Sequence, residues 1–146
     1  MAETQQQNLF KFDRDLEKFA KALEIDVTTV VKKIGFDLFG RIVKKTPVDT
    51  GRARASWTIA INEPDRTVAE AGEHKAYQSA PDEAAKAKAN AGMAALKPYE
   101  PVWISNNLPY IDALEHGHSK QAPEGMVALS IQETEQEIDT ATGAIR

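Results

Sequence analysis

The segment from Thr46 to Trp57, TPVDTGRARASW, joins two parts of the chain that have different hydrophobic patterns. Pro47 lacks a backbone donor and pushes Thr46 towards extended angles, so a helix that arrives from the N-terminal side has to end there. Asp49 is placed to accept a backbone N–H two or three residues on, by closing an Asx turn or by capping one short helical turn. Gly51 tolerates a positive φ. We therefore predict a sharp corner between a helix and a strand.

The residues on the N-terminal side of the corner have the apolar spacing of helices. A short amphipathic helix is predicted from Asp13 to about Glu24, after a polar tail at residues 1–8 that we expect to be flexible. Asp26 is the predicted N-cap of a longer helix, and Lys44-Lys45 supply cations suited to its C-terminal end. The apolar positions are Leu16, Phe19, Ala20 and Leu23 in the first helix and Val27, Val31, Ile34, Leu38 and Ile42 in the second.

The residues on the C-terminal side of the corner have the spacing of strands. Apolar residues alternate with Thr58 and Ala60 in Trp57–Ile61, which predicts a strand with one buried face. Asn62–Arg66 contains a proline and is typical of a turn, and Thr67–Ala71 has the pattern of a weaker return strand. We expect these segments to form a hairpin, and we expect a further strand at Val102–Ile104.

The segment Ser79–Leu96 is rich in alanine and has a different character. Pro81 at a first-turn position and the acids that follow it predict a helix. Its large apolar residues are Met93 and Leu96, so such a helix has little apolar surface to bury. We expect residues 79–97 to be a helical insertion that stands off the core or packs on a neighbouring subunit.

The last third of the chain is predicted to hold two more helices. The expected elements are a turn at Asn106–Pro109, a short helix at Pro109–Glu115 ended by Gly117, a loop at His118–Pro123 and a final helix from about Pro123. In the final helix, we expect Val127, Ile131 and Ile138 to face inward and Glu133, Glu135 and Glu137 to face mainly water.

Length and composition favour one ordinary domain spanning 1–146. The chain is 42% hydrophobic and 27% charged with a net charge of −4, which is typical of a soluble protein rather than a disordered or membrane one. It has no cysteine, which excludes disulfides, thiolate metal sites and a cysteine nucleophile. We find no apolar leader or membrane-spanning run, and expect a protein made in a cytoplasm. The predicted class is α+β: a long helix packed on a small, mainly antiparallel sheet of three to four strands, plus a C-terminal helix.

Charge is distributed unevenly along the chain. Residues 1–57 carry 11 lysines and arginines against 8 acidic residues, whereas residues 119–146 carry 2 against 5. This asymmetry suits a protein that stacks on unlike neighbours, although a solvated surface would also have it.

Two short patterns suggest functions of other classes. Asp49-Thr50-Gly51 is the active-site tripeptide of aspartic proteases, but here it follows a helix stop and precedes Arg52, and no matching apolar strand completes such a site. Phe19–Ile34 resembles a DNA-binding helix-turn-helix, although the second helix runs on to Lys45, beyond the usual length of a recognition helix.

The histidines suggest a metal site only weakly. His116 and His118 flank Gly117 next to Glu115, and His74 lies elsewhere in the chain. This spacing lacks the helical i, i+4 geometry or a third nearby ligand that would make a zinc site convincing. We therefore predict no metal and no cofactor.

A second informative stretch runs from Ile104 to Val127. It holds an Asn-rich strand end, a Pro-Tyr pair, Leu-Glu-x-Gly and Gln-Ala-Pro-x-Gly-Met-Val. Following the Pro47–Arg52 corner in this order, it resembles the tail-component family of tailed bacteriophages, whose members serve as tail-completion, neck or minor tail proteins. The resemblance runs from about Val27 to Ile138. Ala53 and His116 depart from it, because the family often has a larger apolar residue and an aromatic or small residue at these places.

The resemblance implies a non-enzymatic virion protein that forms a ring at the head–tail junction or the tail end. Its partners would be other neck and tail proteins, such as the connector, tail terminator or tube, with non-specific contact to DNA in the channel. Such a protein is made in the host bacterial cytoplasm and resides in the virion. The residues that carry the two motifs are Pro47, Asp49, Gly51, Arg52, Asn106, Pro109, Tyr110, Glu115, Gly117 and Pro123.

Because both motifs recur together in the family, we expect them to meet in space. Arg52, or alternatively Arg54, is predicted to pair with Glu115 or with carbonyls of Ser105-Asn106-Asn107, since a planar guanidinium suits a site with many acceptors. In the competing arrangement both arginines are solvated or face DNA in the channel of a ring.

Overall fold

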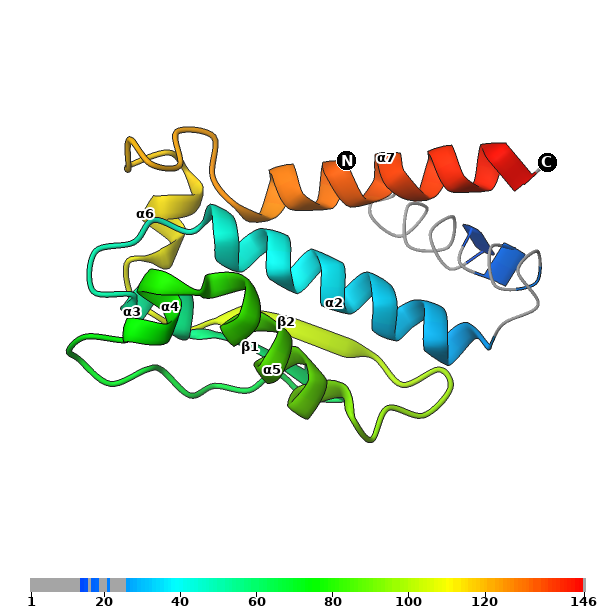
Figure 1. The fold of residues 1–146 in the computed structure, drawn as a ribbon, viewed down its shortest axis with the longest axis horizontal. Coiled ribbons are helices and arrows are strands. Elements are labelled where there is room, and N and C mark those ends of the chain that lie inside the picture. The colour runs from blue at the N-terminus through cyan, green and yellow to red at the C-terminus, as the bar shows by residue number, and fades with distance from the viewer. Residues whose placement is uncertain (1–13, 16, 19–20, 22–25, 146) are drawn as a thin grey trace.

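Helix α2, Val27–Lys45, is the central element of the fold. The computed structural model describes residues 14–15, 17–18, 21 and 26–145. Helix α7, Val127–Ile145, lies along one side of α2, and the sheet and α5 lie on the other side (Figure 1). The helix predicted from Asp13 falls largely outside the described residues, including its whole apolar face; those of its residues that are described are helical.

Both ends of α2 form as the sequence predicts. The Asp26 carboxylate accepts a hydrogen bond from the Thr28 amide at 3.1 Å, which confirms it as the N-cap. The helix ends at Lys45, and Thr46 has extended angles (φ −69°, ψ 129°) because Pro47 follows it. The end of α2 is therefore fixed just before the corner.

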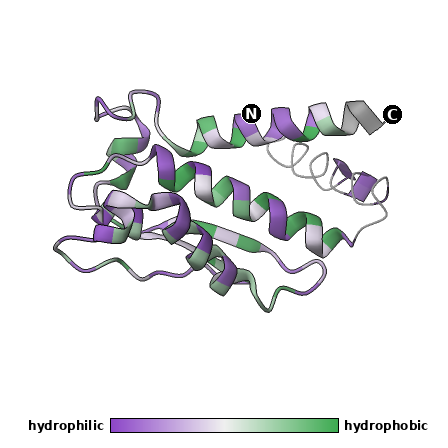
Figure 2. Ribbon diagram, in the orientation of Figure 1, coloured by the Kyte–Doolittle hydropathy of each residue, from purple (hydrophilic) through white to green (hydrophobic). Residues whose placement is uncertain are grey.

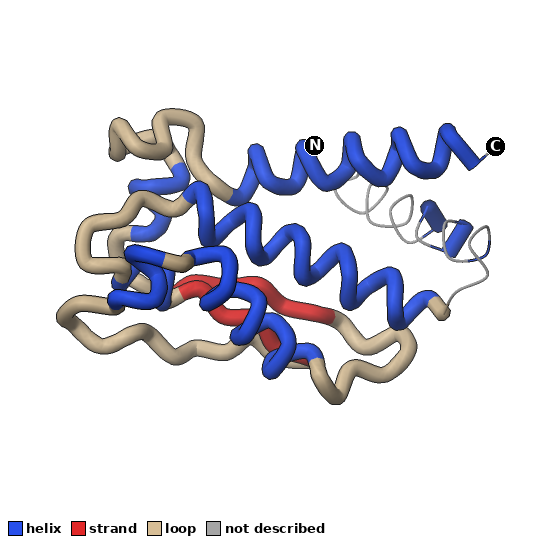
Figure 3. The backbone as a smooth tube through the Cα atoms, in the orientation of Figure 1, coloured by secondary structure: helices blue, strands red, loops and turns tan. Residues whose placement is uncertain are grey.

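The sheet has two strands in the described part of the chain, so the expected three to four strands are wrong. Strand β1, Trp57–Ile61, pairs antiparallel with β2, Val102–Asn106, and Ile59 stands opposite Ile104. Figure 3 shows the two strands beneath α2, with α5 beside them. The strand predicted at Val102 is thus confirmed, but its partner is β1.

The predicted return strand at Thr67–Ala71 is also wrong, because this segment is loop. The carbonyl of Asp65 accepts hydrogen bonds from the Thr58 and Ser105 hydroxyls at 3.1 and 3.2 Å. Those two residues face away from Ile59 and its neighbours on the sheet, so the loop crosses the outer face. Its main chain is held by side chains and does not pair along the edge of β1.

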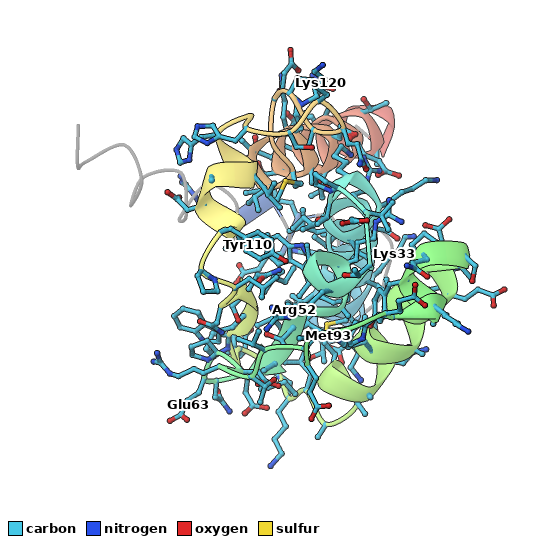
Figure 4. All side chains as sticks on the ribbon, turned by 90° about the vertical axis from the view of Figure 1, so that its left-hand side faces the viewer. Lys33, Arg52, Glu63, Met93, Tyr110 and Lys120 are labelled. Atoms are coloured by element: carbon cyan, nitrogen blue, oxygen red, sulfur yellow. The ribbon has the colours of Figure 1, made fainter. Side chains whose placement is uncertain are left out.

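Helix α5, Pro81–Met93, packs into the main core, which corrects the expectation that the alanine-rich segment stands off it. It follows the short helix α4, Lys75–Ser79. Ala85, Ala89 and Met93 are buried, and Met93 lies in the interior in Figure 4. Small side chains allow the backbones to approach so closely that a Cβ added at Gly92 would lie 2.3 Å from the Ile59 carbonyl oxygen. The alanines contribute to the core by letting α5 approach its neighbours closely, and not by filling space with large side chains.

Helix α7 turns a partly polar face towards α2. Ser130 and Thr134 are buried, and Ile138 packs against Val30. The prediction that Ile131 faces inward is wrong, because 41% of its surface is exposed. Figure 2 shows that α7 mixes hydrophilic and hydrophobic residues along its length, and ion pairs connect it to α2. These pairs join Lys45 to Glu133 and Arg41 to Glu137.

The close approach of α5 to β1 gives a stability prediction. Gly92→Ala should lower the free energy of unfolding by about 1–3 kcal/mol, because the added methyl group overlaps the Ile59 carbonyl and forces the backbones apart. Gly40→Ala is the matched control, since nothing lies within 4 Å of a Cβ there and alanine favours a helix interior. Urea unfolding should show the first variant less stable and the second as stable as the parent or more so. Equal midpoints for both would contradict the packing.

Candidate functional site

The corner consists of a glycine turn followed by one turn of helix. Gly51 has φ 87°, which confirms the predicted positive φ, and α3, Arg52–Ala55, begins directly after it. The Asp49 carboxylate does not cap this helix, contrary to expectation. The Thr50 hydroxyl accepts the Arg52 amide at 3.3 Å, and the side chain of Asp49 is exposed. The side chain that accepts the amide at the start of α3 therefore belongs to Thr50, one residue after the predicted Asp49.

Arg54 fastens the corner to the end of α2. Its Nε donates to the Thr46 carbonyl at 2.8 Å, and its two terminal nitrogens donate to the carbonyls of Lys44 (3.2 Å) and Tyr77 (3.0 Å). The last carbonyls of a helix have no partner within the helix, and a cation also interacts favourably with the helix dipole there. Burial lowers the pKa of the Arg54 guanidinium, and Asp82 partly offsets this effect. One side chain thus connects α2, α3 and α4.

A buried hydroxyl connects α2 to the first residue of β1. Thr46 is fully buried, and its hydroxyl donates to the Ile42 carbonyl at 2.7 Å. The same oxygen accepts a hydrogen bond from the Trp57 indole nitrogen at 2.8 Å. The indole therefore enters the core with its polar atom satisfied.

Lys88 on α5 performs a similar task at the start of β1. Its Nζ donates to the carbonyls of Ala55 and Trp57 at 2.7 and 2.8 Å and lies 5.4 Å from the centre of the Tyr77 ring. Burial lowers the pKa of Lys88, and Asp65 raises it in part. Arg54 and Lys88 together donate to main-chain carbonyls at the end of α2, at the end of α3 and at the start of β1. Neither role was visible in the sequence, because helical spacing does not reveal which carbonyl a basic side chain will reach.

In the second motif, Glu115 caps helix α7. It ends α6, Ile111–Glu115, and its carboxylate accepts hydrogen bonds from the amides of Met126 (2.9 Å), Val127 (2.8 Å) and Ala128 (3.1 Å). Burial raises the pKa of Glu115, but the three amides and the neighbouring His116 outweigh that effect, so the pKa lies below its usual value. Helix N-termini favour such a negative charge.

Two glycines fold the loop between α6 and α7 tightly back. Gly117 and Gly125 have φ 85° and 84°. A Cβ at Gly117 would lie 2.4 Å from the Pro123 carbonyl oxygen, and one at Gly125 would lie 2.2 Å from that of Glu115. The predicted stop at Gly117 is confirmed. The need for Gly125 was missed, although the Pro-x-Gly sequence contained the signal.

The two motifs meet, but not through the predicted arginine pair. Gln121 forms a reciprocal pair with the main chain of Val48, whose amide donates at 2.9 Å and whose carbonyl accepts at 3.2 Å. Asn106 donates to the Ala53 carbonyl at 3.0 Å. The Gln121 side-chain amide thus makes the same pair of hydrogen bonds to Val48 that a neighbouring β-strand would make.

The predicted pairing of Arg52 with Glu115 or with the 105–107 carbonyls is wrong. Arg52 donates from Nε to the Ala69 carbonyl at 2.8 Å, and Arg54 is occupied as described above. The arginines start a helix and not a strand, so they point towards the 69–77 region, while Glu115 is committed to α7. Since both arginines donate within the subunit, the solvated alternative does not describe them either.

Three of the remaining motif residues are exposed, and the fourth, Pro47, is not. Pro109 and Tyr110 are exposed directly before α6, and Pro123 is exposed in the loop before α7. Figure 4 places Tyr110 between the loop around Lys120 and the opposite end of the molecule around Glu63. Pro47 is partly buried where the corner begins.

The described residues give little support to the metal-binding and DNA-binding alternatives. No group of three or more His, Asp or Glu side chains in that part of the chain is arranged to hold a metal ion. His116 bonds through Nδ1 to the Asp112 carbonyl at 2.7 Å, which raises its pKa. The first helix of the helix-turn-helix alternative falls largely outside the described residues, and its second helix, α2, runs on to Lys45, beyond the usual length of a recognition helix. No described helix is both long and apolar enough to cross a membrane.

Residues 10–81 match a protein family described as "Bacteriophage HK97-gp10, putative tail-component". The match covers just under half of the chain and confirms the resemblance to tailed-phage tail components over that part. It contains α2 and the whole corner and ends where α5 begins, so the second motif lies beyond it. No curated protein and no solved structure matches the chain.

The Arg54 contacts predict an asymmetry between two neighbouring substitutions. Arg54→Lys should reduce the free energy of unfolding by about 1–3 kcal/mol, because an ammonium cannot serve three diverging carbonyls and leaves partly buried acceptors without donors. Asp49→Asn, at an exposed side chain, should change it by less than about 0.5 kcal/mol. Chemical denaturation of both variants measures the difference. A fully stable Arg54→Lys protein would refute the bridging role.

The cap at Glu115 predicts a pH-dependent contribution to stability. Because its pKa is lowered in the folded state, the contribution is fully present above the unfolded-state pKa and is lost as pH falls through the folded-state value. Glu115→Gln should therefore cost about 1 kcal/mol at pH 7, the typical worth of a charge at a helix N-terminus, and progressively less below about pH 4. Glu124→Gln, exposed in the same loop, is the control. A Glu115→Gln deficit that stayed constant between pH 7 and pH 3 would argue against the charge effect.

Proposed function

From the match of residues 10–81 to a family of bacteriophage tail components, we propose that this protein is a structural protein of the virion of a tailed bacteriophage. It forms part of the head–tail junction or of the tail end and acts in tail completion. The match is the observation that carries this proposal, because it includes the corner on which the fold turns. The role is mechanical and involves no catalysis.

The proposed working state is a homo-oligomeric ring that stacks on other neck and tail proteins, such as a connector, tail terminator or tube. Rings form when head-to-tail contacts close by rotation, and this needs two different faces on each subunit. Charge is uneven along the sequence, with basic residues in excess before residue 58 and acidic residues in excess after residue 118, and this motivates unlike faces. Arg41 and Lys45 do not contribute to them as free charges, because they pair with Glu133 and Glu137 within the subunit. Contact with DNA in the channel would be non-specific. Synthesis takes place in the host cytoplasm.

The hydrogen bonds of the corner suit a structural role in which the subunit has to stay rigid under mechanical load. Arg54 and Lys88 donate hydrogen bonds to main-chain carbonyls within the subunit. The Thr46 hydroxyl donates to the Ile42 carbonyl of its own helix and accepts a hydrogen bond from the Trp57 indole nitrogen. These groups hold the angle between α2 and the sheet. A subunit in a stacked ring needs such a fixed angle so that its two faces keep their relation.

The proposal is tested in the phage that encodes the protein. Blocking its synthesis should yield filled heads and tails that do not join or do not mature, and supplying the Asp49→Asn protein should restore infectious particles. Supplying the Arg54→Lys protein should restore fewer, in proportion to its lost stability. Mass spectrometry of purified virions should find the protein. Infectious particles that lack it would overturn the assignment, and tight duplex binding with a steep salt dependence would favour the DNA-binding alternative.

A further inference from the structure

The two outer edges of the sheet differ in how they are covered. At the outer edge of β1, the Trp57 carbonyl accepts a hydrogen bond from Lys88 of α5. Further along the same edge, a Cβ at Gly92 would lie 2.3 Å from the Ile59 carbonyl oxygen, so α5 covers this edge closely. On the other side of the sheet, no described strand pairs with the outer edge of β2. The sheet therefore has one covered edge, at β1, and one free edge, at β2.

Val102 and Ile104 direct their main-chain groups towards the free edge. Asn62 donates its amide to the Pro101 carbonyl at 2.8 Å, so the position just before Val102 is a hydrogen-bonded pair of the ladder. Bonded and non-bonded pairs alternate along an antiparallel ladder, and Trp103 is therefore the next residue of β2 that bonds to β1. The amides and carbonyls of Val102 and Ile104 point the other way, and within the described part of the chain they have no partner.

The side chains of β2 do not protect the free edge. Edge strands usually avoid unwanted pairing through charges, prolines or a covering element. The strand Val102–Asn106 has no charged residue and no proline. Trp103 leaves 44% of its surface exposed, and on the opposite face Val102 and Ile104 line an apolar groove of about 470 Å³ against α2. An added strand would thus find main-chain partners at the edge and apolar side chains on both faces.

We propose that the free edge of β2 pairs with β2 of a second copy of this chain, about a two-fold axis. The choice of partner follows from the two edges. A head-to-tail extension of the sheet would need the outer edge of β1, which α5 covers, so the edge that remains on the second copy is its own β2. Such a contact brings a strand against its own sequence, and the lack of charge in Val102–Asn106 leaves no like-charge repulsion across it.

One register satisfies the free main-chain groups. With Trp103 opposite its own copy, Val102 of each strand stands opposite Ile104 of the other, and the two residues exchange N–H···O=C hydrogen bonds. β-Branched side chains then meet on the groove side and the two indoles meet on the outer face, and both kinds of cross-strand pair are stabilising. The joined sheet takes two strands from each copy, whereas a sheet of two strands is marginal by itself.

Trp103→Lys tests the contact, because it sets two ammonium groups opposite each other while changing a side chain that is already exposed. Ile131→Lys is the matched control, since Ile131 is 41% exposed and lies on α7, across α2 from the sheet (Figure 1). Sedimentation over a range of concentrations should show that the parent dimerises. Trp103→Lys should raise the dissociation constant about tenfold or more, and Ile131→Lys should leave it unchanged. A parent that is monomeric throughout, or equal effects of the two variants, would overturn the proposal.

Trp103→Cys tests the register, because the chain has no cysteine of its own. Residues directly opposite in a non-hydrogen-bonded pair have Cα atoms about 4.5 Å apart, which is within the range of a disulfide. Under mild oxidation, Trp103→Cys should therefore give a disulfide-linked dimer. Ser105→Cys, two residues on along the same face, is the control, because its two copies would be offset by about 13 Å along the strands. Equal rates of cross-linking would rule out this pairing of the strands.

Amide exchange separates a second copy from other occupants of the edge. The amides of Val102 and Ile104 should exchange fast in the dilute monomer and about tenfold more slowly once the dimer predominates. Slow exchange in the monomer would mean that the edge is already covered within the subunit, and protection only by another tail protein would assign it to that protein. Either result contradicts the proposal. The ring needs a different, head-to-tail contact, so failure of this two-fold contact would leave the proposed function standing.

Discussion

The fold depends on finding donors for main-chain carbonyls where one element ends and the next begins. At the corner α2 stops, one turn of helix intervenes and a strand starts, so successive carbonyls lose their regular partners. Arg54 and Lys88 reach these carbonyls from α3 and α5, two elements that have to be in place for the contacts to exist. The corner therefore links the position of α5 to the end of α2. Without these donors, the desolvation of the carbonyls would favour an open corner.

The same reasoning explains why α2 occupies the centre. It is covered by α7 on one side and by α5 and the sheet on the other, and Phe39, Ile42 and Val43 are essentially inaccessible to solvent. The two coverings differ in kind. Contacts to α5 are apolar and close, whereas α7 adds buried hydroxyls and ion pairs around a small apolar contact. This difference divides the molecule into a tightly packed body and a more polar attached helix.

Local features could be predicted from the sequence, and features that depend on distant residues could not. The Asp26 cap, the stop before Pro47 and the positive φ of Gly51 follow from the residues at those positions. The partner of β1 was missed because the nearest strand-like segment, Thr67–Ala71, is held across the sheet by the Asp65 and Ala69 contacts. The packing of α5 was missed because small side chains were taken to mean that the helix has little apolar surface to bury. In the structure the same small side chains let the α5 backbone approach α2 and β1 closely. The arginines were correctly linked to a site with many acceptors, but that site lies at Lys44, Thr46 and Tyr77.

The pairing of β1 with β2 has a consequence for how the chain reaches this structure. Thr58 and Ser105, which face each other across the sheet, are 47 positions apart in the sequence. Closing a loop of that length costs entropy before any ladder bond forms, and a ladder of two strands returns little. The intervening α5 shortens the effective loop once it rests on α2 through Ala85 and Ala89. We therefore expect the pairing of the two strands to be the slow, non-local step of folding, and we expect the packing of α5 on α2 to precede it.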